Sequence, residues 1–190
     1  MELLMMIRYL IPGLLIQKSE QLGKDLRRWK EIHHINCQDA KAMAILLWRN
    51  KEFRNLVIYR NRRHPIRRRL IGLFYPPMDT LYIDALEIGG GLYIQHGFAT
   101  IITAKKIGEN CRIYQQVTIG YKNGTNPPVL EDNVAVTCGA KVLGDITMHS
   151  GSLAAAGAVV VKDVPENAIA AGVPARVIGY KDPNYLSFQG

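Results

Sequence analysis

The sequence predicts a mainly β protein with an α-helical N-terminus, in which the second half of the chain winds into a parallel β-helix of hexapeptide repeats. Apolar residues recur there at six-residue spacing with a single one-residue slip, and the pattern breaks after residue 120 and resumes at residue 130. The repeated positions are Ile88, Ile94, Ile101, Ile107, Ile113, Ile119, Leu130, Val136, Val142, Met148, Ala154 and Val160. Glycine often follows the repeated residue at once, as in Ile107-Gly108 and Ile119-Gly120.

A period of six is not typical of the other regular structures. An amphipathic α-helix repeats every 3.6 residues or so and is weakened by glycine. An ordinary strand alternates every second residue and does not demand a small residue at every sixth position. A solenoid of short strands, each turning a corner after one inward apolar residue, has this pattern. Three hexapeptides make one triangular coil, so the repeat predicts about four coils.

The residues before Pro76-Pro77 have a different composition. Apolar residues at helical spacing, among them Ala40, Ala44 and Leu47, predict two or three helices between residues 19 and 69. Proline ends this region because it lacks an N–H and restricts the residue before it. We therefore expect a helical region over residues 1–75, a β-helix domain over residues 76–179 and a short tail over residues 180–190.

The composition is that of a globular protein, with 48% hydrophobic and 21% charged residues. Three cysteines without CxxC spacing argue against a disulfide framework and a structural zinc site, and they favour a cytoplasmic location. Met1–Ile16 is apolar but interrupted by Arg8 and Pro12, and it is too short to span a bilayer. We expect it to form an amphipathic helix that packs on the protein or lies at a surface.

The net charge of +8 is concentrated in one run, because seven arginines and no acid lie between Arg54 and Arg69. This run fits a nucleic-acid or lipid surface, a patch for an anionic ligand, or an ordinary solvated or subunit-contact face. No nucleic-acid motif surrounds it, and no aromatic residue is interleaved between Arg60 and Arg69. We therefore expect no nucleic-acid partner.

Four segments of the second half resemble the serine acetyltransferases, a family of hexapeptide-repeat acyltransferases. They are residues 88–97 (IGGGLYIQHG), 107–120 (IGENCRIYQQVTIG), 139–144 (GAKVLG) and 171–176 (AGVPAR). The resemblance covers about residues 85–180. It implies a left-handed β-helix, acetyl-CoA as co-substrate bound between neighbouring β-helices, and no metal. It also implies a homotrimer, or a hexamer if the helical N-terminus joins two trimers.

His96 matches the catalytic histidine of this family. Acyl transfer to a hydroxyl needs a base that deprotonates the acceptor as it attacks the thioester, and an imidazole suits this role. His96 lies two residues after Ile94, at an expected corner, so its side chain should point away from the core. The resemblance implies that coenzyme A is held by Gly120, Cys138, Gly139 and Ala156, with Lys162 and Arg176 near its phosphates.

The chain departs from the family at the acceptor site. Gln95 replaces an aspartate that binds the serine amine, and Leu81 stands where the family has the aspartate that orients the histidine. Asn126-Pro127 replaces an arginine and a second histidine. The resemblance thus implies an O-acetyltransferase whose acceptor, contacted by Gln95 and Asn126, is either L-serine or a hydroxyl of a sugar or polysaccharide precursor. The alternative is a β-helix scaffold protein that is non-catalytic or metal-dependent.

Overall fold

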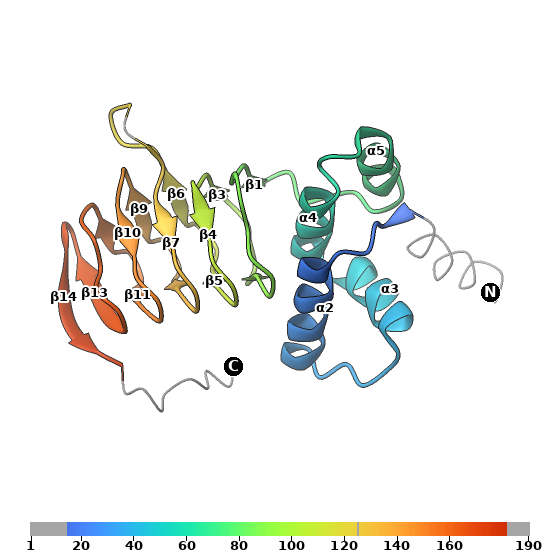
Figure 1. Ribbon diagram of the computed structural model, residues 1–190, viewed down its shortest axis with the longest axis horizontal. Coiled ribbons are helices and arrows are strands. Elements are labelled where there is room, and N and C mark those ends of the chain that lie inside the picture. Colours follow the sequence, from blue (N-terminus) through green and yellow to red (C-terminus); the bar gives the residue numbers. More distant parts are fainter. Residues whose placement is uncertain (1–14, 125, 182–190) are drawn as a thin grey trace.

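The computed structural model describes residues 15–124 and 126–181 of the chain. Its N-terminal part contains the helices α2 (Glu20–Ile32), α3 (Asp39–Arg49), α4 (Lys51–Arg60) and α5 (Pro65–Phe74) (Figure 1). The helical spacing predicted two or three helices ending before residue 70, whereas four are described. The last one forms because Pro65 stands in its first turn, where a missing N–H breaks no hydrogen bond. None of the described helices has the length and apolar character that crossing a bilayer requires.

The second part is a β-helix built from three sheets, and its fold class is as predicted. Sheet A contains β1 (Leu81–Ile83), β3 (Thr100–Ile102), β6 (Thr118–Gly120), β9 (Lys141–Leu143) and β12 (Val159–Val160). Sheet B contains β4 (Lys106–Ile107), β7 (Val129–Leu130) and β10 (Thr147–Met148). Sheet C contains β2 (Tyr93–Ile94), β5 (Arg112–Ile113), β8 (Ala135–Val136), β11 (Leu153–Ala154), β13 (Ala168–Gly172) and β14 (Ala175–Tyr180). The strands of sheet A mark about five coils, one more than predicted, because β1 precedes the first recognisable repeat.

Among the described strands, pairing is parallel throughout the coils, and β13 and β14 alone pair antiparallel, as a hairpin after the last coil. Residues 121–124 and 126–128 leave the solenoid between β6 and β7, where the repeat breaks (Figure 1). The predicted helix over Met1–Ile16 and the predicted tail lie mostly outside the described residues.

The predicted inward positions are buried, with one exception. Ile101 is 46% exposed, while its neighbour Ile102 is fully buried. The expectation that Ile101 faces the core was therefore wrong. The corner before β3 takes up two extra residues, so the inward position falls eight residues after Ile94 and five before Ile107. Isoleucine at both 101 and 102 concealed this shift from the spacing argument.

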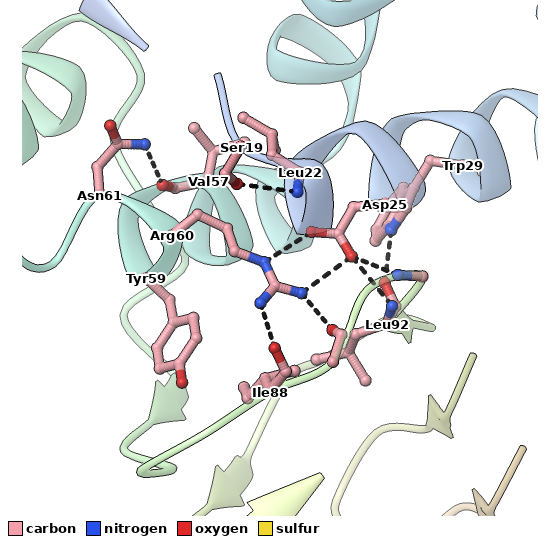
Figure 2. Close-up of polar contacts among 12 residues, drawn as sticks. Ser19, Leu22, Asp25, Trp29, Val57, Tyr59, Arg60, Asn61, Ile88 and Leu92 are labelled. Carbon is pink, nitrogen blue, oxygen red and sulfur yellow. Dashed lines mark hydrogen bonds and ion pairs between the residues drawn. The ribbon is translucent and has the colours of Figure 1, made fainter. Parts of the chain in front are cut away.

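A buried ion pair joins the helices to the first coil (Figure 2). Asp25 of α2 is fully buried and accepts hydrogen bonds from Arg60 Nε at 2.8 Å and Nη2 at 3.1 Å. Asp25 also accepts from the backbone N–H groups of Gly91 at 2.8 Å and Leu92 at 3.1 Å. Burial raises the pKa of the Asp25 carboxyl, and the hydrogen bonds from Arg60 and the two amides oppose that rise. The indole of Trp29 donates to the Leu92 carbonyl at 2.9 Å. Hydrogen bonds from α2 thus fix the segment that leads to β2 and His96.

The arginine run divides into two groups. Arg54, Arg60 and Arg62 donate to backbone carbonyls that cap helices or belong to the first coil, as in the bonds from Arg60 to the Ile88 and Gly89 carbonyls at 2.6 Å. These three are structural residues. The other four, Arg63, Arg67, Arg68 and Arg69, are exposed and lie at or on α5.

Candidate active site

His96 lies on an unusually wide corner between β2 and β3. Its backbone adopts φ 63°, and Gly97 and Ala99 follow with φ 51° each. Left-handed conformations turn the chain sharply, and histidine tolerates them better than most residues. The left-handed residues His96, Gly97 and Ala99 together accommodate the two extra residues of this coil. The His96 side chain is exposed, as expected, and none of the described residues gives its imidazole a hydrogen-bond partner.

Corresponding turns of the next coils stack on this corner, and we call the set the His96 corner. The Gln116 N–H donates to the Phe98 carbonyl at 3.0 Å, and the Gly139 N–H donates to the Gln115 carbonyl at 3.0 Å. The series continues with the Gly157 N–H, which donates to the Cys138 carbonyl at 2.9 Å. The second residue of each turn has a positive φ, and these residues are Ala99, Gln116, Gly139 and Gly157. His96, Cys138, Gly139 and Ala156 therefore lie along one edge of the solenoid.

The small residues leave open space beside this edge. A Cβ at Gly157 would meet nothing within 4 Å, and one at Gly139 would meet only Gly157 atoms at 3.9 Å. Since neighbouring coils are spaced by about 4.8 Å, the edge from the His96 coil to the Ala156 coil is about 15 Å long. An extended ligand arm can therefore approach the backbone of the third and fourth coils at Gly139 and Gly157.

Gln95 lies beside His96 on this corner, whereas three of the other predicted site residues do not lie on it. Gly120 ends β6, Asn126 follows in the loop after it, and exposed Lys162 follows β12, so all three lie at the opposite edge of sheet A. The Asn126 amide donates to Asp145 Oδ2 at 3.2 Å. Gln95 and Asn126 thus sit at opposite edges of one sheet in different coils, and a single chain does not bring them together.

Arg176 is an exposed residue of β14, placed opposite Ala171 of β13. Because β13 is the sheet C strand that leads toward the His96 corner in the last coil, Arg176 lies near the far end of that corner. Its position suits contact with the distal part of a ligand that runs along the edge.

No carboxylate from β1 stands beside His96. Leu81 is buried with its side chain against Gly97, and Asp84 is exposed at the other edge of sheet A. The side chain of Glu52 from α4 reaches the corner at Gly97, since a Cβ at Gly97 would lie 2.9 Å from Glu52 Cγ. Glu52 was missed because the helical half of the sequence gives no sign that α4 packs against this corner.

Gln115 was also missed. It lies on the His96 corner between the coils of His96 and Cys138, and its side-chain Oε1 is buried with no hydrogen-bond partner in the described structure. An unsatisfied buried acceptor is unusual in a native protein and points to a partner that completes it. The six-residue repeat gave no sign of Gln115, because the repeat marks only the inward apolar positions and Gln115 lies on a corner.

The cysteine thiols and the possible metal ligands were also compared with the site. Cys111 is buried inside the coil, and burial raises the pKa of its thiol to about 12, whereas Cys138 is half-buried on the His96 corner. Among the residues that the structure describes, no three His, Cys, Asp or Glu side chains group as metal ligands would.

Comparison with known proteins points to one group of enzymes. No family model matches the chain. The serine acetyltransferase of Synechococcus elongatus is 42% identical over 96 residues, which is 48% of this chain and 39% of that protein. That of Bacillus subtilis is 39% identical over 95 residues, 48% of this chain and 44% of that protein. The matched region thus spans less than half the length of these curated relatives.

Solved structures extend the similarity beyond the β-helix. Serine acetyltransferase from Brucella abortus has a TM-score of 0.65 at 25% identity, covering 86% of this chain and 70% of that one. Its complex with coenzyme A has a TM-score of 0.60 at 24% identity, covering 86% and 68%. The soybean enzyme complexed with serine has a TM-score of 0.56 at 27% identity, covering 82% and 67%. In fold, and in the sequence of its β-helix, this chain is serine acetyltransferase-like.

Proposed function

We propose that the chain is an acetyl-CoA-dependent O-acetyltransferase that transfers the acetyl group directly to an acceptor hydroxyl. The observation that carries the proposal is the His96 corner, which aligns an exposed imidazole with a row of small residues along one edge. The similarity to enzymes solved with coenzyme A and with serine supports the same reading.

In the proposed reaction His96 acts as general base. Its imidazole takes the proton of the acceptor hydroxyl while the oxygen attacks the thioester carbonyl. The tetrahedral intermediate then collapses, the C–S bond breaks, and the departing sulfur recovers the proton from the imidazolium. The products are an O-acetyl ester and free coenzyme A, and no oxidant, metal or protein nucleophile takes part.

Coenzyme A is proposed to lie along the His96 corner. The pantetheine arm would pass Cys138, Gly139 and Ala156, and Arg176 would meet the phosphates at the far end. Gly120 and Lys162, at the opposite edge of sheet A, can join the same site only if they come from a neighbouring copy.

A homotrimer satisfies this requirement, because each site would then combine the His96 corner of one copy with the opposite edge of the next. The outward face of sheet A between the two edges fits such a contact. Tyr82 and Ile101 are register partners there and are 58% and 46% exposed, respectively. All three cysteines are free thiols, which suits the proposed cytoplasmic location.

The acceptor is proposed to be L-serine or a sugar or polysaccharide precursor. The similarity to enzymes that act on serine favours the amino acid. Gln95 and the Asn126-Pro127 pair favour a neutral polyol instead, because they offer amide hydrogen bonds rather than charges for an amine and a carboxylate.

A thiol-release assay with acetyl-CoA tests the proposal against L-serine and a panel of sugars. The informative variant is His96→Asn, because asparagine also tolerates the left-handed backbone of residue 96 but supplies no base. We expect kcat to fall by about 10²–10⁴-fold. His64→Ala, which removes an exposed histidine outside the β-helix, is the matched control. Coenzyme A release by His96→Asn at the wild-type rate would refute the proposed base, and turnover with serine alone would exclude the sugar.

A further inference from the structure

Helix α5 presents large apolar side chains to solvent. Ile66 is 76% exposed, Leu73 is 72% exposed, Phe74 is 50% exposed and Leu70 is 37% exposed. Only Ile71 of this helix is buried. Monomeric soluble proteins rarely gather exposed apolar residues in this way, so a partner surface is indicated.

The exposed residues form one stripe on the side of α5 that faces away from the protein. Ile66, Leu70 and Leu73 recur at i, i+4 and i+7 and so share a helix face. The opposite side rests on α4, since a Cβ at Gly72 would lie 3.9 Å from Ile58 Cδ1. Figure 1 shows α5 at the outer edge of the helical part, remote from the β-helix.

Cationic side chains border this stripe. At roughly 100° per residue, Arg67 and Arg69 fall on its two flanks. Arg63 precedes the helix and Arg68 lies within it, and α5 contains no acidic residue. None of the guanidinium groups of these four arginines has a hydrogen-bond or ion-pair partner among the described residues, in contrast to those of Arg54, Arg60 and Arg62.

We propose that α5 is a peripheral docking helix for an anionic lipid surface. An apolar stripe flanked by arginines lets the aliphatic and aromatic side chains enter the boundary of headgroups and acyl chains while the guanidinium groups contact anionic headgroups. Charge complementarity favours this partner over a second copy of the chain. An isologous contact through α5 would bring two sets of unpaired arginines together. The inference is independent of the acetyl-transfer reaction, because α5 contributes nothing to the His96 corner.

Vesicle co-sedimentation of the full chain tests the proposal. The vesicles are phosphatidylcholine alone or with about 30% phosphatidylglycerol, at about 0.1 M salt, where surface charges are only partly screened. The charge variant is Arg67→Glu/Arg69→Glu, and the apolar variant is Ile66→Ser/Leu73→Ser. The matched control is Lys105→Glu/Lys106→Glu, which makes the same change in net charge at exposed lysines of the β-helix.

We expect the wild type to partition onto the anionic vesicles at least ten-fold more than onto the neutral ones. Both α5 variants should lose most of this binding, and the lysine control should keep it. Absence of wild-type binding, or equal loss in the lysine control, would overturn the proposal. A smaller assembly for Ile66→Ser/Leu73→Ser in sedimentation velocity would also overturn it, because α5 would then be a contact between copies. Far-ultraviolet circular dichroism spectra of both α5 variants that match the wild type show that they are folded.

Discussion

Removing the Asp25 carboxylate should destabilise the junction that carries the active-site strand. Asp25→Ala leaves Arg60 without its anionic partner, although the Arg60 side chain is only 6% exposed. It also leaves the N–H groups of Gly91 and Leu92 without an acceptor. These two residues immediately precede β2 and the His96 corner, so the loss reaches the proposed active site (Figure 2).

The expected magnitude follows from the chemistry of the broken pair. Removing one partner of a buried ion pair costs about 3–5 kcal/mol, because the other charge stays buried and uncompensated. For a chain of this size, 1 kcal/mol corresponds to roughly 2–4 °C in Tm. A loss of about 4 kcal/mol therefore predicts a Tm lower by roughly 8–16 °C.

Thermal unfolding followed by far-ultraviolet circular dichroism, at one protein concentration, measures this difference. The matched control is Asp39→Ala, which breaks an ion pair with Lys30 in which the aspartate side chain is 70% exposed. An exposed pair is worth about 0–1 kcal/mol, so its Tm should change by less than about 4 °C. A Tm for Asp25→Ala within about 2 °C of the wild type, or an equal shift in both variants, would show that the buried pair does not hold the junction.

Three further predictions concern the β-helix. Coenzyme A should protect half-buried Cys138 from a thiol reagent at pH 8. Cys111, whose pKa burial raises to about 12, should react only after unfolding. If coenzyme A does not slow the labelling of Cys138, the proposed path of the pantetheine arm is excluded. Ile102→Ala should cost about 2–5 kcal/mol of unfolding free energy in urea titrations and Ile101→Ala much less, and the reverse order would contradict the register of β3. The pKa of the Glu131 carboxyl is lowered mainly by a hydrogen bond that it accepts from a backbone N–H of the next coil. The ionised carboxylate therefore stabilises the fold above the ordinary pKa of 4.5, and this stabilisation disappears as the pH falls through the lowered pKa. Glu131→Gln should therefore flatten the decline of Tm below about pH 4.5, and an unchanged acid limb would refute this.

The buried residues at the centre of the coils could be predicted because every coil requires apolar side chains at the same inward positions. Every coil needs an apolar inward residue in each short strand, so Ile107, Ile113 and Val142 can be recognised from the sequence. At β3 two adjacent isoleucines satisfy the same pattern, so the spacing predicted Ile101, whereas the left-handed corner at His96 places Ile102 inward.

The candidate site was recoverable in part. The family resemblance predicted His96, Cys138, Gly139 and Ala156 as site residues, and stacking of the corners explains why residues separated by sixty positions share one edge. Glu52 and Gln115 were not recoverable. A helix packs against a β-helix through contacts that leave no period in the sequence, and a corner side chain is constrained only by its neighbours in space.

Local repetition specified the β-helix and its inward residues other than that of β3, and it placed His96 at a corner. Contacts between distant segments decided the rest: the inward residue of β3, the structural use of three arginines, the exposed stripe of α5 and the separation of Gln95 from Asn126 by a full sheet width. The physical reason is the range of the interactions. A repeat depends on residues a few positions apart in the sequence. A buried pair such as Asp25 and Arg60 joins residues thirty-five positions apart and exists only once the chain has folded.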